Sequence, residues 1–241
     1  MALPKLDVPF YDLNLPSNNQ KISYRPFLVK EEKILLMAME GEDEKEITTA
    51  IKQVINNCIV SDGVDVEALP LFDIEFLLLN LRARSMGDVV KTRYARKDCP
   101  EEKCKPVEIE VNVNEIEIEK DPSHDPKIQL TNSVGVIMKY PDMGLMTKYS
   151  GGFEDQNAEL AFDLIIKSIE SVYDEDNVYS KSDYTPEELR EFVEGFSQDQ
   201  FSKIENFFNT LPKMYKDVEF NCDKCGYKEE IRLEGLAGFF G

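Results

Sequence analysis

The sequence predicts an α/β fold of the mixed α+β kind, with an N-terminal helical region, zinc-ribbon-like β-hairpins and an inserted region of strands and helices. Three observations support this fold class. Apolar residues recur at helical spacing in several segments, apolar and polar residues alternate strictly over residues 107–113, and four of the five cysteines form two close pairs. The chain has 241 residues, of which 42% are hydrophobic, and this is enough for a folded core.

The elements fall into four parts along the chain. We expect an extended N-terminal arm (1–29), a helical region (30–87), a zinc-ribbon-like module (88–118 with 214–241) and an inserted strand and helix region (119–213). Prolines at positions 4, 9 and 16 argue against a helix in the arm. The candidate apolar anchors of the arm are Phe10, Tyr11, Leu13 and Leu15.

Two helices are expected at the start of the helical region. The first begins near Lys30, ends near Gly41 and has three apolar residues on one face, namely Ile34, Leu35 and Met39. The second carries an apolar stripe that includes Cys58. We expect Cys58 to lie in the core rather than to be a reactive thiol, because no basic residue sits beside it to lower its pKa.

A third helix is expected with Asp73 as its N-cap, and it should run to about Met86 and stop at Gly87. Strands should follow over residues 88–97 and 107–113, on either side of the first cysteine pair.

The inserted region begins with a turn-rich loop that contains the single histidine, His124. In this loop we expect a solvated imidazole rather than a metal ligand or a catalytic base. A strand pair should follow over residues 128–130 and 134–140. The next segment carries a helical stripe, which consists of Ala161, Leu164, Ile165, Ile169 and Val172.

Capping boxes mark the starts of two further helices. Thr185 with Glu188 opens one, which has Pro186 at its first position, and Ser197 with Gln200 opens the other. The last helix has an apolar stripe, for which we favour the core over an exposed partner groove. Its members are Phe201, Ile204, Phe207, Phe208 and Leu211.

The paired cysteines predict a metal site. Cys99 and Cys104 form a C-x4-C pair, and Cys222 and Cys225 form a C-x2-C pair that is followed by Gly226. Four thiolates in two tight turns are typical of a tetrahedral structural zinc site. Although 117 residues separate Cys104 from Cys222, the entropy of loop closure grows only logarithmically with loop length. Thiols without metal and a redox pair are the alternatives, and the redox pair is disfavoured because no helix start follows the C-x2-C.

We expect no enzyme, no catalytic residue and no small-molecule substrate. Four thiolates close the coordination shell of zinc and leave no position for a catalytic water. The sequence contains no Gly-rich phosphate loop, no nucleophile elbow and no paired-histidine motif. A hydrolase that uses carboxylates is the remaining alternative, but no particular residue in the sequence supports it.

The charge of the chain disfavours nucleic acid as a partner. Lys and Arg number 28 against 47 Asp and Glu, so the net charge is −19 and repels the phosphate backbone. Residues 91–105 are the exception, with six basic and three acidic residues. This cluster supports the alternative function of a zinc-ribbon protein that binds nucleic acid or regulates transcription. The sequence has no apolar run of membrane-spanning length and no secretory signal, and we expect a protein of the reducing cytoplasm.

Three segments resemble the baseplate hub assembly proteins of T-even-type contractile-tailed phages. They are residues 24–40, residues 69–87, and residues 220–226 with 233–240. The resemblance implies a non-enzymatic hub subunit or a hub assembly chaperone that is made in the host cytoplasm and binds other baseplate hub proteins. It leaves open whether the protein stays in the virion, in the tail baseplate. The apolar C-terminal residues Leu236, Phe239 and Phe240 should fold back over the ribbon or anchor a partner.

Overall fold

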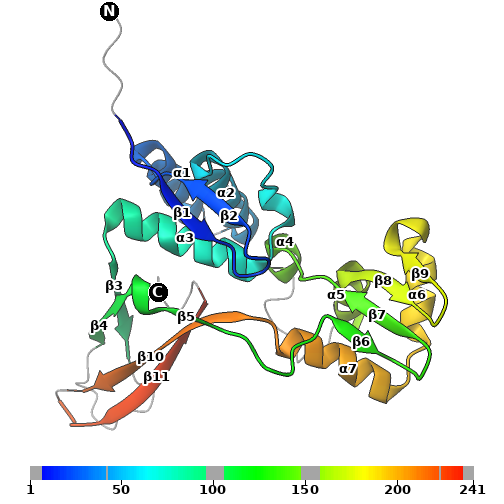
Figure 1. Cartoon of the computed structure of the whole chain (residues 1–241). Helices are drawn as coiled ribbons and strands as arrows, with labels where there is room; N and C mark the ends of the chain where they lie inside the picture. Colours follow the sequence, from blue (N-terminus) through cyan, green and yellow to red (C-terminus); the bar gives the residue numbers. More distant parts are fainter. Residues whose placement is uncertain (1–6, 42, 96–105, 148–157, 223, 236–241) are drawn as a thin grey trace, which may run out of the picture. The chain divides into compact units, whose positions relative to one another are not determined.

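The computed structural model describes residues 7–41, 43–95, 106–147, 158–222 and 224–235. The chain divides into two compact units (Figure 1). Unit 1 comprises residues 1–119 and 213–241, and unit 2 comprises residues 120–212. Each unit combines α-helices with antiparallel strands, so the predicted mixed α+β class is confirmed. In the described part of the chain, no helix has both the length and the apolar character that a membrane crossing requires.

The N-terminal arm of unit 1 is a β-hairpin, formed by β1 (Tyr11–Asn14) and β2 (Lys21–Tyr24). Among residues 7–28, the described part of the arm before α1, there is no helix, as predicted. Leu15 is fully buried and therefore acts as an anchor, but Phe10 is 65% exposed and does not. An isolated bridge from Tyr24 to Ile59 ties the hairpin to the residue after the second helix. The arm is thus part of the core of unit 1.

Three α-helices follow in unit 1: α1 (Val29–Glu40), α2 (Glu44–Cys58) and α3 (Leu71–Met86), with the short 3-10 helix η1 (Val66–Ala68) between the last two. Of the three apolar residues that were predicted to share a face of α1, Ile34 and Leu35 are partly buried and Met39 is 63% exposed. Cys58 is fully buried, so its predicted place in the core is confirmed. A basic group does lie near it, since Nη1 of Arg25 is 3.7 Å from Sγ, yet burial raises the pKa of the thiol to about 11.

The start of α3 differs from the prediction. The N-cap is Pro70, and Asp73 lies inside the first turn and is fully buried. The carboxylate of Asp73 accepts hydrogen bonds from the backbone N–H and the hydroxyl of Ser17. The predicted N-cap is therefore wrong, because a partner 56 residues earlier in the chain takes the carboxylate away from the helix end. The predicted stop is confirmed, since Gly87 caps the C-terminus with φ +107°, a conformation that favours glycine.

The remaining strands of unit 1 form two sheets. In the first, β3 (Val89–Tyr94) pairs antiparallel with β4 (Val107–Asn112). The second has the order β11-β10-β5 and consists of β5 (Glu117–Glu119), β10 (Lys213–Asn221) and β11 (Lys228–Glu234). The 3-10 helix η2 (Val113–Glu115) connects β4 to β5. Both sheets and α3 contribute buried side chains to one cluster, which includes Leu79, Val90, Val111, Met214 and Phe220.

Unit 2 is built on a four-stranded antiparallel sheet of order β6-β7-β8-β9. Its strands are β6 (Lys127–Gln129), β7 (Gly135–Met138), β8 (Ile169–Tyr173) and β9 (Val178–Ser180). The ring of Tyr173 lies over Gly135, where an added Cβ would be 2.2 Å from its hydroxyl oxygen. The predicted strand pair before residue 140 is confirmed by β6 and β7.

The helices of unit 2 are α4 (Met143–Thr147), α5 (Ala158–Ser168), α6 (Pro186–Glu194) and α7 (Gln198–Asn209), with the 3-10 helix η3 (Lys181–Asp183). Capping boxes at Thr185 and Ser197 open α6 and α7 as predicted. Ile204, Phe207 and Phe208 are buried, which confirms the core assignment of the α7 stripe. Of the helical stripe predicted over residues 161–172, Ala161, Leu164 and Ile165 lie on α5. Ile169 and Val172 do not, because the helix ends at Ser168 and both residues lie on β8.

Candidate metal centre and partner surfaces

Cys222 and Cys225 lie in the tight turn between β10 and β11 (Figure 1). The last pair of the ladder is Asn221 with Lys228. Beyond it, the N–H of Cys222 donates to the carbonyl of Tyr227 at 2.9 Å, and the N–H of Gly226 donates to the carbonyl of Cys222 at 2.8 Å. Gly226 has φ +71°, so its lack of a side chain allows the turn. The C-x2-C-G sequence therefore forms a closed turn at the end of a hairpin.

The first cysteine pair belongs to the segment that joins β3 to β4. The ladder of this hairpin ends at the pair Tyr94 and Val107. Cys99 and Cys104 lie in the interval 96–105, outside the described residues. The structure thus brings Cys222 and Cys225 together and does not place the other two predicted ligands. In the described ranges, no group of three or more His, Cys, Asp or Glu residues could hold a metal ion.

The end of the first hairpin packs beside the cysteine turn of the second. The rings of Tyr94 and Phe220 meet edge to face, with their centroids 4.9 Å apart. Cys222 is 6% exposed and belongs to the same buried cluster as Phe220. Val107 and Cys225 pack against this cluster as partly buried residues. Sequence analysis did not identify the Tyr94–Phe220 contact, because two aromatic residues so far apart in the chain give no local signal.

Charges on the first hairpin are largely compensated. The ammonium of Lys91 forms ion pairs with Glu108 at 2.7 Å and with Glu110 at 3.0 Å. The hydrogen bond from Lys91 lowers the pKa of the Glu108 carboxyl. Arg93 lies directly across the ladder from Glu108. In the described part of the predicted basic cluster, acidic residues of β4 therefore oppose the cations.

His124 in unit 2 is not solvated as predicted. Its ring stacks against both Tyr140 and Phe207, at centroid distances of 5.6 and 5.0 Å, and these two rings also contact each other at 6.1 Å. Nδ1 is 2.9 Å from the hydroxyl of Thr210, and this hydroxyl donates its own proton to the carbonyl of Asn206 at 2.7 Å. The proton of the neutral ring is therefore on Nδ1. The buried Nε2 has no hydrogen-bond partner among the described residues, and burial lowers the pKa of the imidazole.

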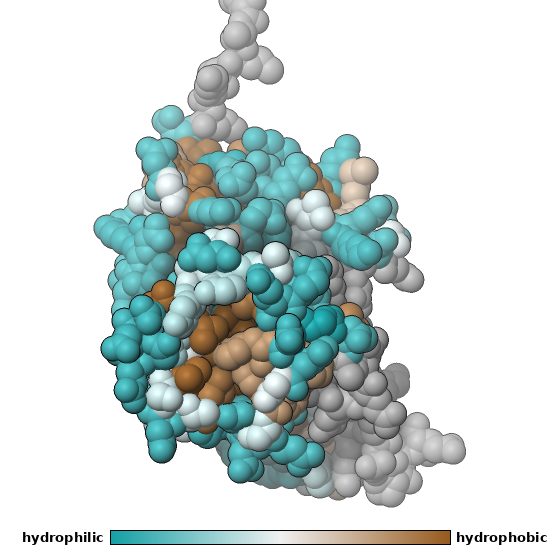
Figure 2. Space-filling model, turned by 90° about the vertical axis from the view of Figure 1, so that its right-hand side faces the viewer, coloured by the Kyte–Doolittle hydropathy of each residue, from teal (hydrophilic) through white to brown (hydrophobic). Residues whose placement is uncertain are grey.

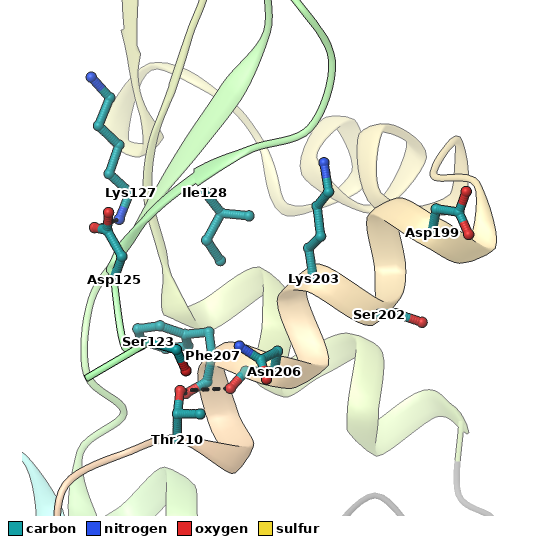
Figure 3. A pocket seen from close by; sticks show the side chains of 10 residues that line it. All are labelled: Ser123, Asp125, Lys127, Ile128, Asp199, Ser202, Lys203, Asn206, Phe207 and Thr210. Atoms are coloured by element: carbon teal, nitrogen blue, oxygen red, sulfur yellow. Dashed lines mark hydrogen bonds between the residues drawn. The ribbon is translucent and has the colours of Figure 1, made fainter. Parts of the chain in front are cut away.

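A cavity of about 430 Å³ lies next to this aromatic stack, between the loop before β6 and helix α7 (Figure 3). Two lysines and two aspartates line it, namely Lys127, Lys203, Asp125 and Asp199. The ammonium of Lys203 donates to the carbonyl of Gln129 at 2.7 Å and is thus engaged in holding α7 to the sheet. The charges that line the cavity are therefore mixed in sign.

Apolar surface is exposed in both units. Figure 2 shows a hollow of hydrophobic residues surrounded by hydrophilic ones on the visible face. Large apolar side chains that are more than half exposed include Phe10, Val29, Leu36, Met37, Met39, Met86 and Val178. Exposed apolar surface with a polar rim is typical of protein–protein contact sites.

These features describe a protein of two α+β units, in which hairpins, caps and ion pairs stabilise the fold and several large apolar side chains are exposed. Comparison with protein families identifies the family. The chain matches the T4 bacteriophage base plate protein family over residues 8–241 and belongs to it. No curated protein and no solved structure matches the chain. The protein is therefore a phage baseplate protein, and its family implies interaction with other baseplate proteins.

Proposed function

We propose that the chain is a subunit of the baseplate hub, or a chaperone of hub assembly, that is made in the host cytoplasm and performs no catalysis. The family match over residues 8–241 is the observation that carries the proposal. The resemblance of residues 24–40, 69–87 and 220–226 with 233–240 to hub assembly proteins supports the hub within the baseplate. Two of these segments contain α1 and α3, which are major helices of unit 1.

We also propose that Cys99, Cys104, Cys222 and Cys225 bind one structural zinc ion. The turn geometry of the second pair and the contact between Tyr94 and Phe220 support this proposal. Tyr94 precedes Cys99 by five residues and Phe220 precedes Cys222 by two, so the aromatic contact lies near both cysteine pairs in the sequence. The role of the zinc is to join the two hairpins, because four thiolates close its coordination shell.

The hub proposal is tested by co-expression of the chain with the hub proteins of the same phage. We expect a complex that elutes ahead of the free chain in size-exclusion chromatography. Deletion of the gene should abolish normal tails, and expression of the chain from a plasmid should restore them. The absence of any complex, together with normal tails after deletion, would contradict the proposal.

A second measurement separates the subunit from the chaperone. Mass spectrometry of purified tails should detect the chain if it is a subunit. A chaperone would be found in complexes from infected cells and not in finished tails.

A further inference from the structure

Helix α1 leaves an apolar face uncovered. Of its twelve residues only Glu31 is buried, and Val29, Leu36 and Met37 are 80%, 55% and 61% exposed. Large apolar side chains on the solvent-facing side of a helix are expected where another protein surface covers them. Methionine is also frequent at protein contact surfaces, because its side chain adapts to the partner.

The opposite face of α1 is fixed to unit 1. The fully buried carboxylate of Glu31 pairs with Arg25, at 3.0 Å from Nη2, and accepts a hydrogen bond from the N–H of Leu28 at 2.9 Å. Ile34 and Leu35 are partly buried, and α1 packs against α2. The exposed face is therefore held in a defined orientation, which reduces the entropy lost when a partner binds.

The exposed face is complementary to itself. Residues 33, 36, 37 and 40 lie on one side of a helix with 3.6 residues per turn. Lys33 and Glu40 are two turns apart, about 10 Å along the axis, and flank Leu36 and Met37. Both charged side chains are exposed, and neither has an ion-pair partner among the described residues. When a second α1 runs antiparallel about the point between Leu36 and Met37, Lys33 of each copy faces Glu40 of the other.

We propose that this face of α1 is a two-fold interface between two copies of the chain. The axis passes between Leu36 and Met37, whose side chains form the apolar centre, and two Lys33–Glu40 ion pairs flank it. The charges determine that the helices run antiparallel, because a parallel pair in register would bring like charges together. The inference rests on the geometry of α1 and is independent of the hub assignment.

The predicted dimer is weak. One face of a three-turn helix buries far less than the roughly 800 Å² per partner of a standard interface. We expect a dissociation constant between about 1 µM and 1 mM for the free chain. Additional contacts within an assembly would raise the effective concentration of the two copies and stabilise the same pair.

Charge exchange tests the geometry by sedimentation equilibrium of the full chain. Lys33→Glu and Glu40→Lys should each weaken self-association about tenfold, because each change replaces two attractions by two repulsions. An equimolar mixture of the two variants should associate as tightly as the wild-type chain. In the mixed pair, the acidic side chains of the Lys33→Glu copy face the basic side chains of the Glu40→Lys copy at both positions.

The apolar centre is tested by Leu36→Asp, which should make the chain monomeric. Val178→Asp is the matched control, since Val178 is 69% exposed on β9 and should not affect association. Circular dichroism verifies that each variant is folded. A wild-type chain that is monomeric at about 1 mM, a dimer that tolerates Leu36→Asp, or a mixture of charge variants that does not associate would each overturn the proposal. A monomer that binds another baseplate protein through Leu36 would also overturn it.

Discussion

Single residues of this protein derive their properties from distant partners. The Nδ1 proton of His124 is directed at Thr210, which leaves the buried Nε2 without a partner among the described residues. A charged ring would bury a second N–H donor without an acceptor, so the folded state favours the neutral form. The position of the proton on His124 thus follows from the Thr210 hydroxyl, 86 residues away.

His124 should make the stability of unit 2 sensitive to pH. Burial lowers its pKa below the ordinary value of 6.5, so the unfolded chain binds the proton more tightly than the folded one. The stabilisation is complete above pH 6.5 and decreases as the pH falls from 6.5 toward the folded-state pKa. His124 is the single histidine, so the effect in this range is attributable to it. Urea denaturation between pH 7.5 and pH 5.5 measures it, and His124→Phe should remove it. If the free energy of unfolding of the His124→Phe variant depends on pH as strongly as that of the wild type, the prediction is contradicted.

Glu31 should be essential for the position of α1. Replacement by Ala removes the acceptor for Arg25 and for the N–H of Leu28, and we expect a loss of about 2–3 kcal/mol in the free energy of unfolding. Glu32→Ala is the matched control and should change the free energy by less than about 0.5 kcal/mol, because Glu32 is only partly buried and has no such network. Chemical denaturation followed by circular dichroism distinguishes the two. Equal effects would show that the buried ion pair does not stabilise the fold.

Residues with local partners were predicted correctly, and residues with distant partners were not. The capping residues Thr185 and Ser197 bond to groups three residues ahead, so the sequence contains the whole motif. Asp73 is a residue type that is favoured at N-caps, but Ser17, 56 positions earlier in the chain, donates hydrogen bonds to its carboxylate. Arg25 and Cys58 are 33 residues apart in the chain, so the neighbours of Cys58 in the sequence give no sign of this basic group.

At the scale of elements, the two hairpins of unit 1 form one packed cluster without sharing a ladder. Phe220 on β10 contacts Tyr94 on β3, and the side chains of Val90, Val111 and Leu233 are buried in the same cluster. Alternation of apolar and polar residues predicted the strands correctly. It could not predict which strands pair, since β5 continues the alternation of β4 yet pairs with β10.

The zinc proposal predicts about one zinc per chain by elemental analysis. Cys222→Ser should remove the metal and lower the melting temperature, because structural zinc contributes on the order of 10 kcal/mol to small zinc domains. Cys58→Ala is the matched control, since this buried thiol lies on α2 and should leave the zinc content unchanged. Protein that contains no zinc and has the same stability as the Cys222→Ser variant would refute the site.

At the scale of the whole molecule, unit 2 is inserted between two paired strands of unit 1. The chain leaves unit 1 after Glu119 and returns at Lys213, and these two residues are partners in the β5–β10 ladder. Arg232 on β11 connects the two strands at this place, because it donates hydrogen bonds to Asp217 on β10 at 2.8 and 3.0 Å and to Glu119 on β5 at 3.0 Å. The ends of the insertion therefore lie side by side.

Unit 1 should fold without unit 2. When residues 120–212 are replaced by a short Asn-Gly turn, β5 and β10 become a hairpin with an unchanged register. We expect a soluble, cooperatively unfolding protein with the zinc content of the full chain. The control keeps the same turn and changes Arg232 to Ala, which should destabilise the shortened chain further. An unfolded product with intact Arg232 would show that unit 1 requires its insertion.

The sequence predicted the fold class and the phage baseplate family because both depend on patterns spread along the chain. It did not predict the exposed face of α1. Ile34 and Leu35 are as apolar as Leu36 and Met37, so the sequence does not distinguish the partly buried pair from the exposed one. The assignment to the hub and the zinc site stay predictions until they are measured.

The pairing of β5 with β10 also has a consequence for the order of folding during synthesis. Ribosomes deliver the chain from the N-terminus, so all of residues 120–212 has been made before the partner of β5 appears. Unit 2 can complete its core while β5 is still unpaired. Unit 1 starts first and finishes last, when the strands β10 and β11 are released with the final cysteines. A nascent chain that has emerged from the ribosome up to residue 212 would therefore carry a folded unit 2 on an incomplete unit 1.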